Sequence, residues 1–150
     1  MSRERLEQLI KELETKAVKV GYFEHSTYTD GTPIAYVAAI QELGYVKGGI
    51  PARPTLHPAM EAGTPNYKNG VARAFRNAMA GADLVTGLNA IGEVAAGDVK
   101  QAISSLTTPA LKQSTVDARR RRHHAGKASD KPLVDSGQML QAVTYSVEDA

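Results

Sequence analysis

Hydrophobic and polar positions at the start of the chain predict a helix followed directly by a strand. Over residues 2–16, apolar side chains recur three and four positions apart, which is the spacing of a helix with one buried face. Residues 17–23 alternate instead, so that Val18 and Val20 share one face, as in a strand whose other face is in water. Ser2 precedes the helical pattern and is a suitable N-cap.

The next segment is predicted to be a second helix, over residues 33–43, followed by a stiff arm. Thr32 is placed to cap this helix, Pro33 suits its first position and Gly44 suits its left-handed end. Residues 45–58 form a proline-rich arm, because three prolines within eight positions exclude both a helix interior and a regular strand ladder. An extended, rigid conformation is expected there.

Residues 59–110 are predicted to be mostly helical. A stretch that contains glycine and proline, 63–70, is expected to interrupt the first part of this region. Asp83 then caps a long helix that runs to about Leu106, with a stripe of apolar residues along one side.

The closing part of the chain combines several short elements. Its pattern predicts a helix over 115–122, a polar loop over 123–131, one helical turn capped by Asp135 or Ser136, and a strand over 143–148. Because the run ends in a strand, we expect it to join the sheet that the first strand begins.

These elements predict an α+β fold in a single domain, residues 1–150. The sheet is expected to be small, twisted and mostly antiparallel, and to be flanked by helices, one of them long. It should combine the 17–23 and 143–148 strands with at least one strand from residues 24–50. A length of 150 residues fits one domain with one modest core.

Charge along the chain is uneven. The net charge is +2, but residues 112–131 carry seven Lys or Arg against two Asp, so the rest of the chain has a net charge of −3. This basic helix and loop suits contact with nucleic acid or with an acidic partner. The candidate contact residues are Arg119, Arg120, Arg121, Arg122 and Lys127.

The run of four arginines also has a simpler interpretation. Consecutive residues on a helix face all sides, so the four side chains cannot reach one surface together. As solvated cations near a helix C-terminus they would be electrostatically favourable without any partner.

Little in the sequence suggests catalysis. The chain has no Cys, which excludes disulfides and thiolate chemistry, and His123 and His124 are adjacent, so their side chains diverge rather than share a metal. Neither a nucleophile elbow nor a glycine-rich phosphate loop is present. We therefore expect no enzyme activity, cofactor or metal, and no apolar run approaches the roughly 20 residues of a membrane helix.

The proline-rich arm and the closing strand are candidates for contacts between subunits. Arg53 stands between Pro51 and Pro54, where a rigid backbone could hold it as a donor to a carboxylate of a neighbouring subunit. The alternative is a surface arginine on a rigid loop. The predicted interface comprises Ile50, Pro51, Arg53, Pro54, Leu56, Met60, Val143 and Tyr145.

Two motifs in this order carry a resemblance to a known family. Residues 50–54 read Ile-Pro-Ala-Arg-Pro, and residues 132–145 contain Pro-Leu-Val-Asp-Ser-Gly followed by Val-Thr-Tyr. With the elements around them, they resemble the tailed-phage neck and tail-completion proteins, also described as virion morphogenesis proteins or minor tail protein Z. The resemblance covers about 17–148. The chain departs from the family pattern at Thr55, where an aromatic residue usually follows Arg-Pro, and in the 63–70 insert.

The resemblance implies a structural role. It implies a homo-oligomeric ring, usually a hexamer, at the head–tail junction or at the head-proximal end of the tail, with a channel for DNA. Its partners would be other neck and tail proteins, such as a connector or adaptor and the tail tube or terminator. The protein would be made in the host cytoplasm and reside in the virion. The alternative is a small basic nucleic-acid-binding protein that uses residues 112–131.

Overall fold

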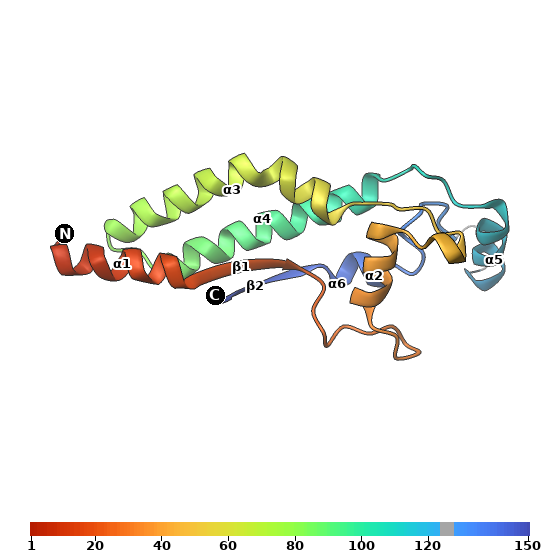
Figure 1. The fold of residues 1–150 in the computed structure, drawn as a ribbon, viewed down its shortest axis with the longest axis horizontal. Helices are drawn as coiled ribbons and strands as arrows, with labels where there is room; N and C mark the ends of the chain where they lie inside the picture. The colour runs from red at the N-terminus through yellow and green to blue at the C-terminus, as the bar shows by residue number, and fades with distance from the viewer. Residues whose placement is uncertain (124–127) are drawn as a thin grey trace.

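A computed structural model describes residues 1–123 and 128–150, and it has an α+β fold. Among these residues the elements follow one another as in Figure 1. They are α1 (Arg3–Thr15), β1 (Lys16–Gly21), α2 (Ile34–Leu43), the short 3-10 turn η1 (Val46–Gly48), α3 (Leu56–Met79), α4 (Leu84–Ser105), α5 (Gln113–His123), α6 (Gln138–Ala142) and β2 (Thr144–Asp149). The predicted fold class, including a long helix and a small antiparallel sheet, is confirmed.

Two of the predicted helix caps are present. The Ser2 hydroxyl accepts a hydrogen bond from the Arg5 amide at 3.2 Å, and an Asp83 carboxylate oxygen accepts one from the Thr86 amide at 2.7 Å. Each cap satisfies an amide that has no partner inside its helix. The starts of α1 and α4 are therefore specified by local sequence, as predicted.

Other predicted helix starts were wrong. Thr32 does not cap α2, because its amide donates to the Asp30 carboxylate at 2.9 Å and Pro33 occupies the N-cap position. The cap position of α6 belongs to Gly137, in a left-handed conformation with φ of 81°, rather than to Asp135 or Ser136. The helix predicted to begin at residue 115 begins two residues earlier.

The predicted interruption at residues 63–70 is also wrong, because α3 runs unbroken through it for 24 residues. Gly63 and Gly70 are buried, and a side chain at Gly70 would meet Ile91 of α4 at 2.9 Å. Gly70 therefore allows Ile91 to approach α3 closely, and Gly63 leaves room for the Tyr67 side chain of the same helix. Pro65 has no amide hydrogen, so the Glu61 carbonyl four residues earlier lacks its usual hydrogen-bond donor. Both residues are exposed, and water can therefore satisfy that carbonyl.

The sheet contains two antiparallel strands, with Lys16 opposite Asp149 at one end and Gly21 opposite Thr144 at the other. The third strand predicted from residues 24–50 is absent from the described part of the chain. That region forms isolated bridges, Thr27 with Pro33 and Tyr45 with Ile50, which close local turns.

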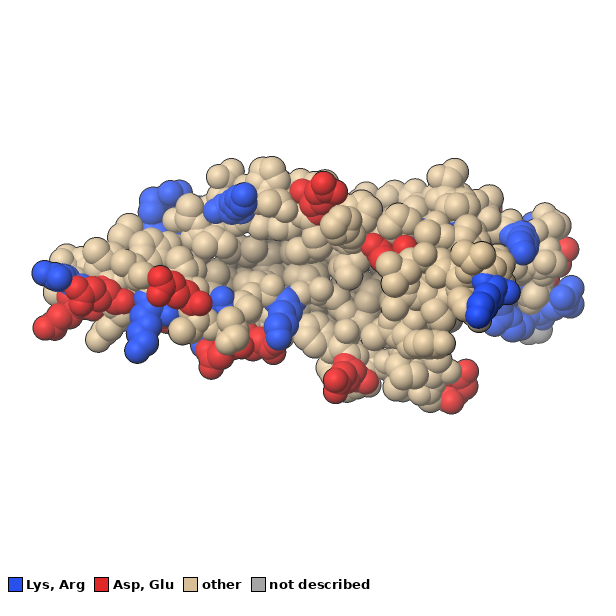
Figure 2. Space-filling view, viewed as in Figure 1, with Lys and Arg blue, Asp and Glu red and all other residues tan. Residues whose placement is uncertain are grey.

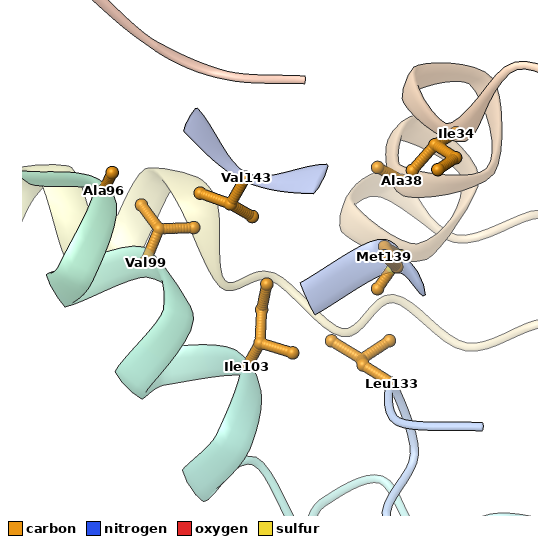
Figure 3. Close-up of a cluster of buried hydrophobic side chains, with 8 residues drawn as sticks. All are labelled: Ile34, Ala38, Ala96, Val99, Ile103, Leu133, Met139 and Val143. Carbon is orange, nitrogen blue, oxygen red and sulfur yellow. The ribbon is translucent and has the colours of Figure 1, made fainter. Parts of the chain in front are cut away.

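Two hydrophobic clusters hold the elements together. The first joins α2, α4, α6 and the segment before α6, and Figure 3 shows its side chains converging between these elements. It consists of Ile34, Ala38, Ala96, Val99, Ile103, Leu133, Met139 and Val143. The second lies between α1 and the α3–α4 hairpin, and consists of Leu9, Ala74, Ala78, Leu84 and Leu88. Because the clusters lie in different parts of the fold, the molecule is elongated (Figure 1).

Candidate assembly surfaces

Arg53 is buried within its own chain, with 5% of its surface exposed. Its Nε donates to the Pro109 carbonyl at 2.8 Å and its Nη2 to the Ala110 carbonyl at 3.1 Å, while Nη1 reaches Gln41 Oε1 at 3.3 Å. The predicted outward donor to a neighbouring subunit does not fit these contacts. Arg53 instead ties the arm to α2 and to the segment that leads into α5.

Glu42, which the sequence did not single out, fixes the end of the proline-rich arm. Its Oε2 accepts hydrogen bonds from the Thr55 amide at 2.7 Å and the Leu56 amide at 3.1 Å, and its Oε1 accepts one from the His57 amide at 2.9 Å. The carboxylate therefore caps α3, which begins inside the predicted arm. A cap that lies 13 residues upstream has no local sequence signature.

The other predicted interface residues divide between the interior and the surface. Val143 is 1% exposed and belongs to the first cluster. Leu56, Met60 and Tyr145 are half-buried against the same cluster. Of the remaining three, Ile50 is half-buried and Pro51 and Pro54 are exposed. Only part of the predicted interface is therefore accessible to another molecule.

Within the run of four arginines, Arg119 binds backbone carbonyls of its own chain. Its Nη1 donates to the carbonyls of Lys131 at 2.7 Å, Ser129 at 3.2 Å and Val134 at 3.3 Å, and its Nη2 to that of Pro132 at 3.1 Å. The side chain is 8% exposed, and this burial lowers the pKa of Arg119 below its usual value. The guanidinium thereby fixes the backbone before α6, and its predicted contact with DNA or an acidic partner does not fit.

Asp135 anchors two more residues of the same helix. Its Oδ2 lies 3.0 Å from Arg122 Nη2, and its Oδ1 lies 2.9 Å from His123 Nε2. Arg119 Nε is 3.6 Å from the same carboxylate. Asp135 thus acts as a shared partner for two arginines and a histidine rather than as the predicted helix cap.

The remaining arginines face solvent at the α5 end of the molecule. Arg120 is exposed and lies 3.9 Å from Asp117, and Arg121 is exposed as well. Figure 2 shows the blue side chains gathered at this end. Lys127, the fifth predicted contact residue, lies outside the described residues, as does His124.

A cavity of about 380 Å³ opens beside the Asp135 cluster. Its wall includes Tyr28, Arg122 and His123. The charged groups in it pair with one another, which suits a structural role. No group of three or more His, Asp or Glu side chains that could hold a metal occurs in residues 1–123 and 128–150. Within the same ranges, no helix is both long and apolar enough to cross a bilayer.

No family model, curated protein or solved structure matches the chain. What the protein does is therefore inferred from its own surfaces. Two apolar surfaces of the described residues differ in shape and bear on this question.

The first apolar surface protrudes from α2 and η1, and we call it the α2–η1 knob. It comprises Tyr36 (63% exposed), Leu43 (79%), Tyr45 (49%) and Val46 (95%). Tyr36 and Leu43 are two helical turns apart and share one side of α2. Tyr45 exchanges two backbone hydrogen bonds with Ile50, so the turn that carries Val46 is closed at its base.

The second apolar surface is concave and lies between β1 and α3, and we call it the β1–α3 groove. It has a volume of about 400 Å³. Val18 and Val20 form one wall, Met60 and Val71 the other, and Ile91 of α4 lies among the lining residues. In Figure 2 the molecule is hollowed between α3, along the upper edge, and the strands below it.

The total accessible surface is large for the size of the protein. The chain exposes 9556 Å², whereas a folded monomer of 16.0 kDa exposes about 7,400 Å². The difference, about 2,000 Å², exceeds the roughly 1,600 Å² that one subunit buries against two neighbours through interfaces of standard size. The chain therefore has enough excess surface for contacts on two sides.

Proposed function

We propose that the protein is a structural subunit that assembles with copies of itself into a ring. The observation that carries this proposal is the exposed surface of 9556 Å², which is about 2,000 Å² more than a compact monomer of this mass presents. An elongated chain with two small cores gains most from neighbours that cover its apolar surfaces. A ring is the closed assembly in which each subunit uses two different surfaces.

The internal arginine contacts support a structural role. Arg53 and Arg119 together occupy seven oxygen acceptors of their own chain, of which six are backbone carbonyls. Both lie in or beside the segments that resemble the phage family, and each restrains a segment that lacks regular structure. Rigid segments lose less conformational entropy when they dock, which favours repeated, identical contacts.

The finer part of the proposal rests on the family resemblance. By that resemblance, the ring is a hexamer at the head–tail junction, or at the head-proximal end of the tail, of a phage particle. It has a channel for DNA, and it contacts a connector or adaptor and the tail tube or terminator. Its role is geometric, without catalysis or a cofactor, and its final location is the virion after synthesis in the host cytoplasm.

The nucleic-acid-binding alternative has weaker support. Arg119 is buried and Arg122 is paired with Asp135, so two of the four arginines have partners within the chain. Arg120 and Arg121 remain exposed, as does Lys112. Two or three cations suit a weak, salt-sensitive contact with passing DNA better than a dedicated binding site.

Native mass spectrometry and electron microscopy of the purified protein test the proposal. We expect a single oligomer with rotational symmetry, and we expect the protein to be found at the head–tail joint of virus particles. A chain that stays monomeric at every concentration and is absent from particles would contradict the proposal. A chain that instead binds DNA tightly as a monomer, and loses that binding when Arg120 and Arg121 become Ala, would support the alternative.

A further inference from the structure

The α2–η1 knob and the β1–α3 groove are complementary in shape and in character. Val46, at the tip of the knob, has 95% of its surface exposed, which is unusual for a large aliphatic side chain on a turn closed at its base. The groove has space for several such side chains, about 400 Å³, and its lining is mostly valine, leucine and other apolar residues, with Lys16 as its one charged member. Each surface leaves apolar area in water that the other could cover.

The knob is formed before any partner binds. A side chain at Gly48 would collide with the Tyr45 ring, so this ring packs directly over the glycine backbone. Gly49 has a φ of 65° and allows the turn to reverse direction. Little conformational entropy therefore remains to be lost when the knob docks.

The charges beside the two surfaces are also complementary. The knob carries an exposed lysine, Lys47, next to Val46. On the side of the groove, the Tyr67 hydroxyl donates to Asp98 at 2.6 Å, and the hydrogen bond to Asp149 raises the pKa of Lys16. Lys16 itself is paired with Asp149 at 2.8 Å. Asp98, which Tyr67 of the groove contacts, is therefore opposite in charge to Lys47.

The two surfaces lie in different parts of the molecule, on α2 and η1 in one half and between β1 and α3 in the other (Figure 1). We propose that the α2–η1 knob of one copy occupies the β1–α3 groove of a second copy. This inference rests on the proposed function and makes it specific. Such a contact joins unlike surfaces, so each subunit keeps a free knob and a free groove until rotation closes the ring.

Engineered cysteine pairs test this contact, because the natural chain has no Cys to interfere. The variant that combines Val46→Cys with Val71→Cys places one thiol on the knob and one on the groove wall. Under mild oxidation we expect disulfide-linked multimers on a non-reducing gel. The control pairs Val46→Cys with Val94→Cys, which is exposed on α4 but does not line the groove, and should remain uncrosslinked.

A second pair of variants provides an independent measurement. Val46→Glu should convert the oligomer to a monomer by native mass spectrometry, while Val94→Glu should leave the oligomer intact. Both substituted positions are exposed, so circular dichroism should show unchanged folding in each variant.

The outcomes separate this inference from the proposed function. A natural chain that forms no oligomer overturns both. An oligomer that survives Val46→Glu, with no crosslink between positions 46 and 71, overturns only the knob and groove contact. Dimers linked through Val46→Cys alone would also overturn it, since they would indicate that like surfaces meet.

Discussion

Glu42 and Thr55 join the end of α2 to the start of α3. The Glu42 carboxylate accepts the Thr55 amide hydrogen at 2.7 Å and takes the amides of the next two residues as well. A negative charge at a helix N-terminus is stabilised both by these hydrogen bonds and by the helix dipole. The arm between the two residues is therefore anchored at both ends.

Replacing this cap should destabilise the protein. We expect Glu42→Ala to lower the free energy of unfolding by about 2 kcal/mol, at the upper end of the range for lost N-caps, because three amides lose one acceptor. Urea unfolding followed by circular dichroism measures the change. Glu61→Ala, which replaces an exposed glutamate of α3, is the control and should change stability by less than about 0.5 kcal/mol. Equal effects of the two substitutions would refute the capping role.

The carbonyl contacts of Arg119 lead to a second prediction. Arg119→Lys keeps the positive charge but cannot span the four carbonyls that the guanidinium holds. Partly buried carbonyls left without donors should cost about 3 kcal/mol of unfolding free energy. Arg121→Lys, on the exposed side of α5, should be neutral in the same denaturation experiment. If Arg119→Lys is equally neutral, the carbonyl contacts do not stabilise the fold.

Two glycines of α4 form a matched pair for a third prediction. A side chain at Gly92 would collide with the Tyr145 ring, whereas a side chain at Gly97 would meet nothing within 4 Å. Gly92→Ala should therefore reduce stability by about 2 kcal/mol through overpacking between α4 and β2. Gly97→Ala should increase stability by about 0.5 to 1 kcal/mol, because alanine favours the helix. Thermal unfolding of the two variants should shift in opposite directions, and a shared direction would contradict the packing described here.

Asp83 should make stability depend on pH in the acid range. Its hydrogen bonds from the Thr86 side chain and amide lower the pKa of Asp83 below its ordinary value of 3.8. A carboxylate with a lowered pKa in the folded state contributes stability that is fully present above pH 3.8 and is lost as the pH falls through the lower folded value. Asp83→Asn keeps an acceptor but cannot titrate, so its thermal midpoint should change less than that of the natural protein as the pH falls. Identical acid profiles would show that this linkage is absent.

The elements that were predicted correctly depend on local signals. The helix capped by Ser2, the strand after it and the long helix that begins after Asp83 follow from apolar spacing and from caps within three residues of their amides. Observed and predicted ends of the two strands differ by no more than two residues, for example at Gly21, where the backbone leaves β1 with a φ of 149°. Local periodicity was sufficient for these elements.

The functions assigned to the arginines could not be predicted in the same way. Arg53 and Arg119 looked like surface cations, yet both donate to backbone carbonyls, which every residue carries and which leave no mark in a sequence. The accepting carbonyls lie 56 and 57 residues from Arg53 and up to 15 residues from Arg119. Helix α3 was divided wrongly because glycine propensity was weighed without knowing that Ile91 needed the space at Gly70.

The passage from α1 into β1 without an intervening loop has a mechanical consequence. Thr15 ends the helix, Lys16 begins the strand, and Asp149 lies opposite Lys16 in the ladder. A force that pulls α1 away from the end of β2 would separate the six residue pairs one after another, beginning with Lys16 and Asp149. A force that pulls the two strands lengthwise past each other would instead load all six pairs together. The ladder is therefore weak against peeling and strong against shear.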